Sequence, residues 1–225
     1  MNGRRSYQTI ASQIEALIRT KYEIGDRLPG ERDLAKRYNV SRPTVREAIV
    51  SLEIGGLVDV KTNSGIYVAA RSASPPGGDP GPPPFEILKT RMIVEPEVAA
   101  LAAEHAVAED FQKMETALSQ MREEDARNEP TELGDRMFHC ALAQACGNGM
   151  LIELVELLWD RQQKSEMWLK ADSHGRTPEL RPSWVADHLA VFGALERRDG
   201  KGARDAMTHH LERVWEILLE AGAPE

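Results

Sequence analysis

Cysteines, aromatic residues and long apolar runs are scarce in this chain of 225 residues. The two cysteines, Cys140 and Cys146, lie on a segment with helical periodicity and face different sides of it, so we expect both to stay reduced. No apolar stretch approaches the ~20 residues that cross a bilayer, and no apolar signal core follows Arg4 and Arg5. These absences argue against a disulfide-rich secreted protein and against a membrane protein. They predict a soluble, cytoplasmic one.

Charge is unevenly distributed along the chain, although the formal net charge is −8. Residues 1–71 contain 12 Lys and Arg against 8 Asp and Glu, a net charge of +4, whereas residues 72–225 have a net charge of −12. A basic first part suits contact with phosphate groups, and an acidic remainder does not. The pattern favours nucleic acid as the partner of the N-terminal part.

Proline and glycine are concentrated in residues 71–84, which cannot form a packed element. Such a segment acts as a semi-stiff spacer and marks a domain boundary. We therefore expect one domain over residues 1–70, a linker over residues 71–84 and a second domain over residues 85–225.

The first domain contains a helix-turn-helix pattern. Two short amphipathic segments flank a tight turn at Tyr38–Val40, and the second segment opens with Ser41, a good N-cap. Pro43 is tolerated there because its position in the first turn needs no backbone N–H. A preceding helix over Tyr7–Tyr22 and two strands around a hairpin tip at residues 62–65 complete a predicted winged helix-turn-helix.

The start of the second helix of this motif carries side chains suited to reading DNA. Arg42 and Arg46 are about one turn apart, are predicted to point away from the core, and match the bidentate recognition of guanine. Ser41 and Thr44 have short hydroxyl groups that can bond phosphates or base edges. Gly65 at the wing tip has no side chain and allows close approach to a groove. We interpret this domain as DNA-binding.

The second domain shows helical periodicity throughout and no strand pattern. We expect an all-α antiparallel bundle, and hence a mainly α fold for the whole chain. The predicted helices are Phe85–His105, Ala108–Arg127, Leu133–Ala145, Gly149–Ala171, Pro182–Arg198 and Lys201–Ala221.

Four residues of this bundle could hold a metal ion. Asp135 and His139 are spaced i, i+4 and share one helix face. His188 and His210 lie on the last two helices, and periodicity allows them to face the first pair without requiring it. A carboxylate with imidazoles suits a divalent transition metal such as Zn, Ni or Mn. The alternative is that these side chains are caps or surface groups.

Three further residues are candidates for binding an anionic effector. The Arg91 guanidinium matches a carboxylate bidentately, although its spacing equally allows a surface pair with Glu95. Asn148 and Trp168 are weaker candidates, and Trp168 suits a core position or a dimer contact better than a ligand wall.

The first domain resembles the winged-helix head of GntR-type bacterial transcription regulators, and the second resembles the all-helical ligand domain, or FCD domain, of their FadR-like branch. The residues that carry the first resemblance are Gly25–Pro29, Glu31–Ala35, Val40–Ala48, Leu52 and Gly56–Leu57. Those that carry the second are Arg91, Glu95, Asp135, Phe138–His139, Asn148, His188 and His210.

This resemblance implies roles that the residue pattern leaves open. It adds Arg32 to the DNA contacts, and it implies that Asp135, His139, His188 and His210 bind the metal. It selects His210 over the adjacent His209. It also implies a homodimer on a pseudo-palindromic operator.

A narrower similarity points to the effector. Pro84–Leu88, Glu166–Trp168 and the spacing to Asp187–His188 are similar to repressors of hexuronate catabolism. This implies a sugar acid as the small carboxylate effector.

The leading hypothesis is a regulator, most often a repressor in this family, and not an enzyme. Its effector would shift an equilibrium between arrangements of the two heads. A regulator of the same type that responds to another organic acid is the first alternative. A metal-dependent hydrolase or lyase in the helical half is the second, although no further Glu or His has an evident general-base role. An architectural DNA-binding protein is the third, and the acidic second domain argues against it.

Overall fold

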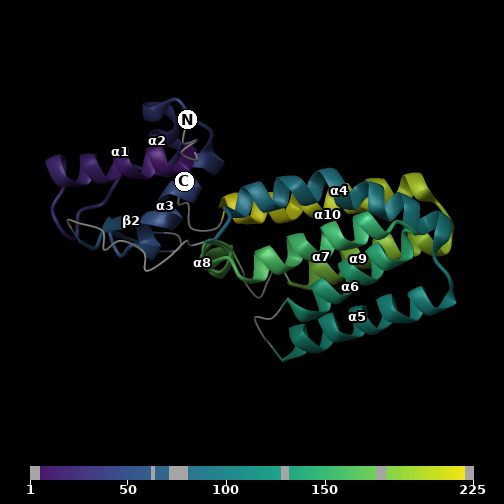
Figure 1. Cartoon of the computed structure of the whole chain (residues 1–225). Coiled ribbons are helices and arrows are strands. Elements are labelled where there is room, and N and C mark those ends of the chain that lie inside the picture. The colour runs from purple at the N-terminus through teal and green to yellow at the C-terminus, as the bar shows by residue number, and fades with distance from the viewer. Residues whose placement is uncertain (1–5, 62–63, 71–80, 128–131, 176–180, 221–225) are drawn as a thin grey trace. The chain divides into compact units, whose positions relative to one another are not determined.

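The computed structural model describes residues 6–61, 64–70, 81–127, 132–175 and 181–220 (Figure 1). It divides into two compact units. The first comprises Met1–Phe85, Gln163–Gly175 and Glu216–Glu225, and the second comprises Glu86–Gln162 and Arg176–Trp215. Apart from one two-stranded sheet, the described elements are helices. The predicted mainly α fold is confirmed.

The first unit opens with a three-helix head. Its helices are α1 (Ser6–Lys21), α2 (Glu31–Tyr38) and α3 (Arg42–Ile54). The apolar face of α1 packs on α3. The core of the head is made of side chains that are at most 6% exposed, namely Tyr7, Ile10, Ile14, Leu17, Ile18, Leu34, Val45, Ile49 and Leu52.

The turn between α2 and α3 has the geometry that its residues predict. Asn39 ends α2 in the left-handed region with φ 52°, a conformation that asparagine tolerates better than most residues. Ser41 is the N-cap of α3, its Oγ accepts from the Thr44 N–H at 3.4 Å, and Pro43 lies in the first turn. The predicted cap and the predicted place of the proline are confirmed.

A short hairpin follows α3. Strand β1 (Val58–Lys61) pairs antiparallel with β2 (Gly65–Val68), in a register that places Val60 opposite Ile66. The segment before α2 adds to its edge, because the Leu28 N–H donates to the Ile66 carbonyl at 2.8 Å. This is the wing of the predicted motif. Residues 62–63 of its predicted tip lie outside the described residues.

The second unit is a helical bundle. It is built from most of α4 (Pro84–His105), α5 (Ala108–Ala126), α6 (Leu133–Ala145), α7 (Gly149–Gln163), α9 (Arg181–Glu196) and most of α10 (Gly200–Glu220). Helix α5 packs against α6 and α9 (Figure 1). Both cysteines are free thiols. Among the described residues, no helix combines the length and the apolar character needed to span a membrane.

One predicted helix is wrong, because Gly149–Ala171 is divided into α7 and α8 (Glu166–Gly175). Ser165 explains the break: its Oγ accepts from the Trp168 N–H at 3.1 Å, which is the bond of an N-cap that starts a new helix. Most of the predicted linker, residues 71–80, lies outside the described residues.

Candidate functional site

The N-terminus of α6 is held in place by a buried carboxylate on α5. Glu124 is 5% exposed, and its Oε1 and Oε2 accept from the Gly134 N–H at 3.2 and 3.4 Å. A Cβ atom on Gly134 would lie 2.6 Å from the Met121 backbone nitrogen, so glycine permits this close approach of the two helices. The contact fixes the turn of α6 that begins with Asp135.

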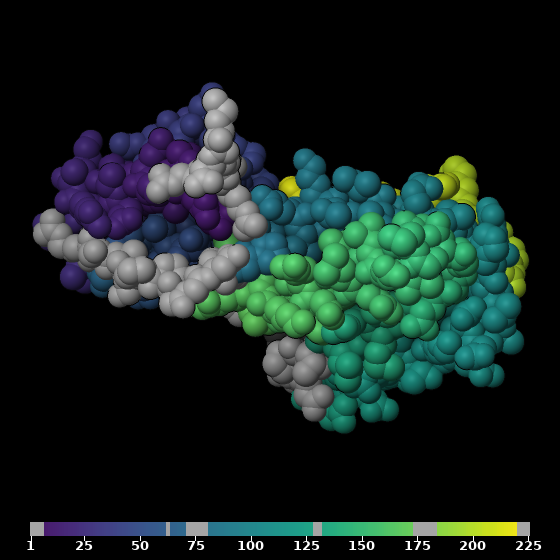
Figure 2. All heavy atoms as spheres, viewed as in Figure 1, coloured from purple at the N-terminus to yellow at the C-terminus, as the bar shows by residue number. Residues whose placement is uncertain are grey.

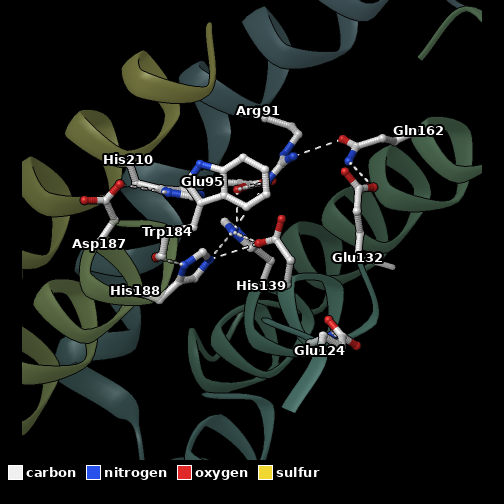
Figure 3. Close-up of polar contacts among 12 residues, drawn as sticks. Arg91, Glu95, Glu124, Glu132, His139, Gln162, Trp184, Asp187, His188 and His210 are labelled. Atoms are coloured by element: carbon white, nitrogen blue, oxygen red, sulfur yellow. Dashed lines mark hydrogen bonds and ion pairs between the residues drawn. The ribbon is translucent and has the colours of Figure 1, made fainter. Parts of the chain in front are cut away.

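The structure brings Asp135, His139, His188 and His210 together from α6, α9 and α10. Figure 3 labels the three histidines of this group. One ligand atom from each residue lies within 4.8 Å of the other three. His188 Nε2 is 2.9 Å from Asp135 Oδ1 and 3.3 Å from His139 Nε2. His139 Nε2 is 3.2 Å from the same carboxylate oxygen. The four side chains therefore form a cluster that could hold a metal ion.

His210 provides a direct test of whether this cluster fits a metal. Its side chain is 3% exposed, and neither ring nitrogen has a hydrogen-bond partner in the described structure. The nearest carboxylate is that of Asp187, with Oδ2 3.9 Å from Nδ1. Leaving a buried polar group unpaired is costly, and a metal ion would satisfy the nitrogen that faces the cluster. Two ligands at about 2.1 Å from a tetrahedral ion are about 3.4 Å apart, close to the separation of His139 and His188.

The other two imidazoles are oriented by contacts on their outer nitrogens. His139 Nδ1 is 2.6 Å from Glu95 Oε2, and His188 Nδ1 is 2.7 Å from the Trp184 carbonyl oxygen. A proton on Nδ1 leaves the lone pair on Nε2, and in both residues Nε2 faces the cluster (Figure 3). Such contacts behind a histidine are typical of metal ligands.

Burial and the contacts between its members both shift the pKa values of the cluster. Burial by itself would raise the pKa of Asp135, but His139 and His188 lower it well below the usual value. Burial, together with the neighbouring His188, lowers the pKa of His210 to about 4. At neutral pH Asp135 is therefore ionised and His210 is neutral, the states in which both groups coordinate metals.

Arg91 borders this cluster, with Nη2 3.4 Å from His139 Nε2, and has several further partners. Its Nε is 2.8 Å from Glu95 Oε1, its Nη2 is 3.3 Å from Glu95 Oε2, and its Nη1 donates to Gln162 Oε1 at 2.9 Å. The guanidinium also lies 4.2 Å from the centroid of the Trp159 ring. The pair with Glu95 that the spacing allows is thus present, but it is buried and not on the surface. Effector binding by Arg91 stays a prediction.

The other two candidate effector residues are not part of the cluster. Asn148 is exposed and caps α7, because its Oδ1 accepts from the Met150 N–H at 3.1 Å. Trp168 is 2% exposed and belongs to the first unit, whereas the cluster belongs to the second.

The candidate DNA contacts differ in exposure. Arg32 and Ser41 are exposed, and Arg42 and Thr44 are partly exposed. Arg46 differs from the expectation that it points away from the core, because it is 2% exposed and its Nη1 lies 2.6 Å from Glu31 Oε1. The physical reason is that Glu31, at the start of α2, supplies a buried carboxylate that attracts the guanidinium.

Gly65 is also less accessible than expected. It is buried, its φ is 131°, and a Cβ atom there would lie 2.6 Å from Arg27 Nε. Glycine is therefore required at this position both for the backbone conformation and for the space that the Arg27 side chain occupies.

Sequence reasoning missed the groups that surround the metal cluster. Glu95 stands out in the sequence as a partner for Arg91 at i+4 and as one of the residues that carry the family resemblance, but neither feature indicates contact with His139. Gln162 and Trp159 carry no signal at all, since each is an ordinary residue on the apolar side of α7. Asp187 directly precedes His188, and this adjacency was the one available indication.

Comparison with known proteins identifies both parts of the chain. Residues 6–68 match the gntR family of bacterial regulatory proteins, and residues 86–213 match the FCD domain. The chain is 39% identical to the Uxu operon transcriptional regulator of Escherichia coli (strain K12), over 97% of this chain and 89% of that protein. It is 34% identical to the Exu regulon transcriptional regulator of the same organism, over 96% of this chain and 85% of that protein.

Solved structures support the fold. The Escherichia coli protein McbR/YncC matches with a TM-score of 0.53 and 21% identity, covering 96% of this chain and 97% of that one. Streptococcus agalactiae GntR matches with a TM-score of 0.50 and 23% identity, covering 93% and 99%. The prediction of a regulator and not an enzyme is confirmed by the gntR family match and by the Uxu operon and Exu regulon regulators. The chain belongs to the GntR family of bacterial transcription regulators, with a DNA-binding head followed by an FCD domain.

Proposed function

We propose that this regulator is a repressor whose operator binding responds to a sugar acid of the hexuronate class, bound at a divalent metal held by Asp135, His139, His188 and His210. The observation that carries the proposal is the buried cluster of one carboxylate and three imidazoles, in which His210 has only a long contact of 3.9 Å with Asp187 outside the cluster. The relatives named as Uxu operon and Exu regulon regulators support the class of effector.

The charges around the cluster suit an anionic effector. Arg91 neutralises Glu95, so a divalent ion with Asp135 as its charged ligand would keep a net charge of about +1. Four protein ligands leave one or two positions on Zn, Ni or Mn for a carboxylate and an adjacent hydroxyl oxygen. The metal would supply Lewis acidity to bind these oxygens, and no bond of the effector needs to break.

In the head, we assign DNA contact to Arg32, Ser41, Arg42, Thr44 and Arg46, whereas the buried Gly65 would only shape the wing around Arg27. The exposure of Arg32 and Ser41 supports this, and Arg42, which is partly exposed, would have to leave the Leu219 carbonyl oxygen to which its Nη2 donates at 3.1 Å. For Arg46 to contact DNA, its guanidinium must either break the ion pair with Glu31 or bind the DNA while it keeps that pair. The protein would act in the cytoplasm, where its operator lies.

A homodimer would place two recognition helices on successive half-sites. Helices α4 and α7, joined by the Arg91–Gln162 hydrogen bond, lie side by side on the visible face of the second unit (Figure 2). They carry the exposed apolar side chains Ile93, Met150 and Leu157, which are 68%, 70% and 51% exposed. An interface with a second copy would cover exposed apolar side chains of this kind.

Two measurements test the proposal. The untagged full chain, stripped with a chelator and reloaded with Zn²⁺, Ni²⁺ or Mn²⁺, is screened by thermal shift against glucuronate, galacturonate, lactate and gluconate. Fluorescence anisotropy with the DNA flanking its own gene then measures operator affinity with and without each acid. We expect a metal-dependent rise in Tm with a hexuronate, because specific binding stabilises the folded state, and a change in operator affinity with the same acid.

Each part of the proposal can be contradicted by a specific outcome. A chain that binds none of these metals overturns the metal centre. An equal response to lactate and no response to hexuronates overturns the effector class while leaving the family unaffected.

A further inference from the structure

We propose that Glu95 and Arg91 are positioning residues for the metal centre: Arg91 fixes the Glu95 carboxylate, and Glu95 holds the His139 ring so that Nε2 faces the metal. The inference rests on the proposed metal site and assigns to Arg91 a role other than binding the effector.

Glu95 is placed to select the tautomer of His139. The Glu95 side chain is 1% exposed, and its Oε2 lies 2.6 Å from Nδ1 of the fully buried His139 ring. A carboxylate at this distance favours a proton on Nδ1, which leaves the lone pair on Nε2. Nε2 is the atom that lies 3.2 Å from Asp135 Oδ1 and 3.3 Å from His188 Nε2. The ring is thus set to coordinate through Nε2.

Arg91 is placed to hold that carboxylate. Both Glu95 oxygens face its guanidinium, at 2.8 Å from Nε and 3.3 Å from Nη2. Bidentate contact between these planar groups fixes the orientation of the carboxylate as well as its position. The charge of Arg91 also compensates a carboxylate that burial would otherwise destabilise, and it contributes to lowering the pKa of Glu95 to about 2.

The guanidinium is fixed from its other side as well. Its Nη1 donates to Gln162 Oε1 at 2.9 Å, and Gln162 Nε2 donates to Glu132 Oε2 at 3.1 Å (Figure 3). The Trp159 ring lies against the guanidinium at 4.2 Å. Nη2 also lies 3.4 Å from His139 Nε2, and a metal ion on that nitrogen would replace only this long contact. An effector carboxylate would have to displace Glu95 or Gln162 to pair with Arg91 through two nitrogens. The contacts therefore favour a supporting role for Arg91.

The test compares zinc affinity among variants of the full chain, by competition with a chromophoric chelator. Glu95→Gln keeps the shape of the side chain but removes its charge, and we expect roughly 10- to 100-fold weaker Zn²⁺ binding, the usual loss for a group behind a metal-bound histidine. Arg91→Lys keeps the positive charge but cannot grip both carboxylate oxygens, and we expect a smaller loss. Glu31→Gln is the matched control, since it neutralises a similarly buried carboxylate that is paired with Arg46 and belongs to the first unit, whereas the metal cluster belongs to the second.

A second measurement detects the tautomer of the His139 ring directly. It uses the wild-type chain, so it does not depend on whether a variant folds. Nitrogen-15 NMR of the zinc-loaded wild-type chain should show His139 protonated at Nδ1 and coordinated through Nε2. Coordination through Nδ1 overturns the proposal, as does a zinc affinity of Glu95→Gln equal to that of the wild type.

The two remaining outcomes separate this inference from the proposed function. Loss of hexuronate binding in Arg91→Lys at unchanged zinc affinity makes Arg91 an effector anchor and overturns the inference alone. A wild-type chain that binds no Zn²⁺ overturns both.

Discussion

Glu31 and Arg46 form a buried ion pair inside the head, with Oε1 and Nη1 2.6 Å apart and each side chain 3% exposed. Nε and Nη2 of Arg46 have no hydrogen-bond partner in the described structure. Removing one member of such a pair leaves the other charge buried without compensation. In the free head, Arg46 therefore contributes to the contact between α2 and α3 whether or not it also reads a base.

Replacing Arg46 should destabilise the protein as well as weaken DNA binding. We expect Arg46→Ala to lower the free energy of unfolding by about 3–5 kcal/mol, because Glu31 remains buried and loses its close partner, keeping only the longer contact with Arg42. Urea denaturation of the full chain, followed by circular dichroism, measures the loss. Arg42→Ala is the matched control, since its Nη2 lies 3.9 Å from Glu31 and its side chain is 26% exposed. Equal stability of the two variants would show that the buried pair contributes nothing.

Arg42 and Arg32 should affect operator binding in different ways. Arg42→Ala is expected to cost about 1–3 kcal/mol and to relax the sequence preference at one position, if its guanidinium reads a base. Arg32→Ala should weaken binding to all sequences alike and reduce the salt slope by about 1, as a phosphate contact does. Anisotropy titrations at several salt concentrations, with the operator and with a scrambled duplex, separate the two. Uniform weakening by Arg42→Ala would remove it from the base contacts.

The adjacent histidines of α10 provide a paired test of the metal centre. His210 is 2% exposed and belongs to the cluster, whereas His209 is exposed. We expect His210→Ala to abolish the rise in Tm on adding Zn²⁺ and His209→Ala to keep it, because a ligand stabilises only the state that binds it. Thermal melts of chelator-treated protein with and without Zn²⁺ provide the measurement. The opposite result for the two variants would reassign the ligand.

Acid should destabilise the metal-free chain partly through Glu95. Burial raises the pKa of this carboxyl, but Arg91 and His139 together lower it from 4.5 to about 2. The unfolded chain takes up the proton near pH 4.5 and the folded chain only near pH 2, so the stability contributed by Glu95 is complete above pH 4.5 and is lost between these values. Denaturation midpoints across this range should fall more steeply for the wild type than for Glu95→Gln. Parallel curves would contradict the assignment.

Much of the fold follows from local patterns that the sequence displays. The apolar periodicity of α1, the Ser41 cap with Pro43 behind it, and the i, i+4 spacing of Asp135 and His139 each depend on a few consecutive residues. Helix geometry translates such spacings directly into shared faces. The limit of this reasoning appears at Ser165, where a continuous apolar pattern hides the cap that starts α8.

The sequence by itself determined the winged head, the helical bundle, the charge contrast between them and, through family resemblance, the four residues of the cluster. Only the tertiary structure decided that Arg46 is buried against Glu31, that Gly65 makes room for Arg27, and that Glu95 connects Arg91 to His139. The physical reason is that these contacts join different elements. Their distances depend on how helices and strands pack, and side-chain packing between elements leaves no periodic trace along the chain.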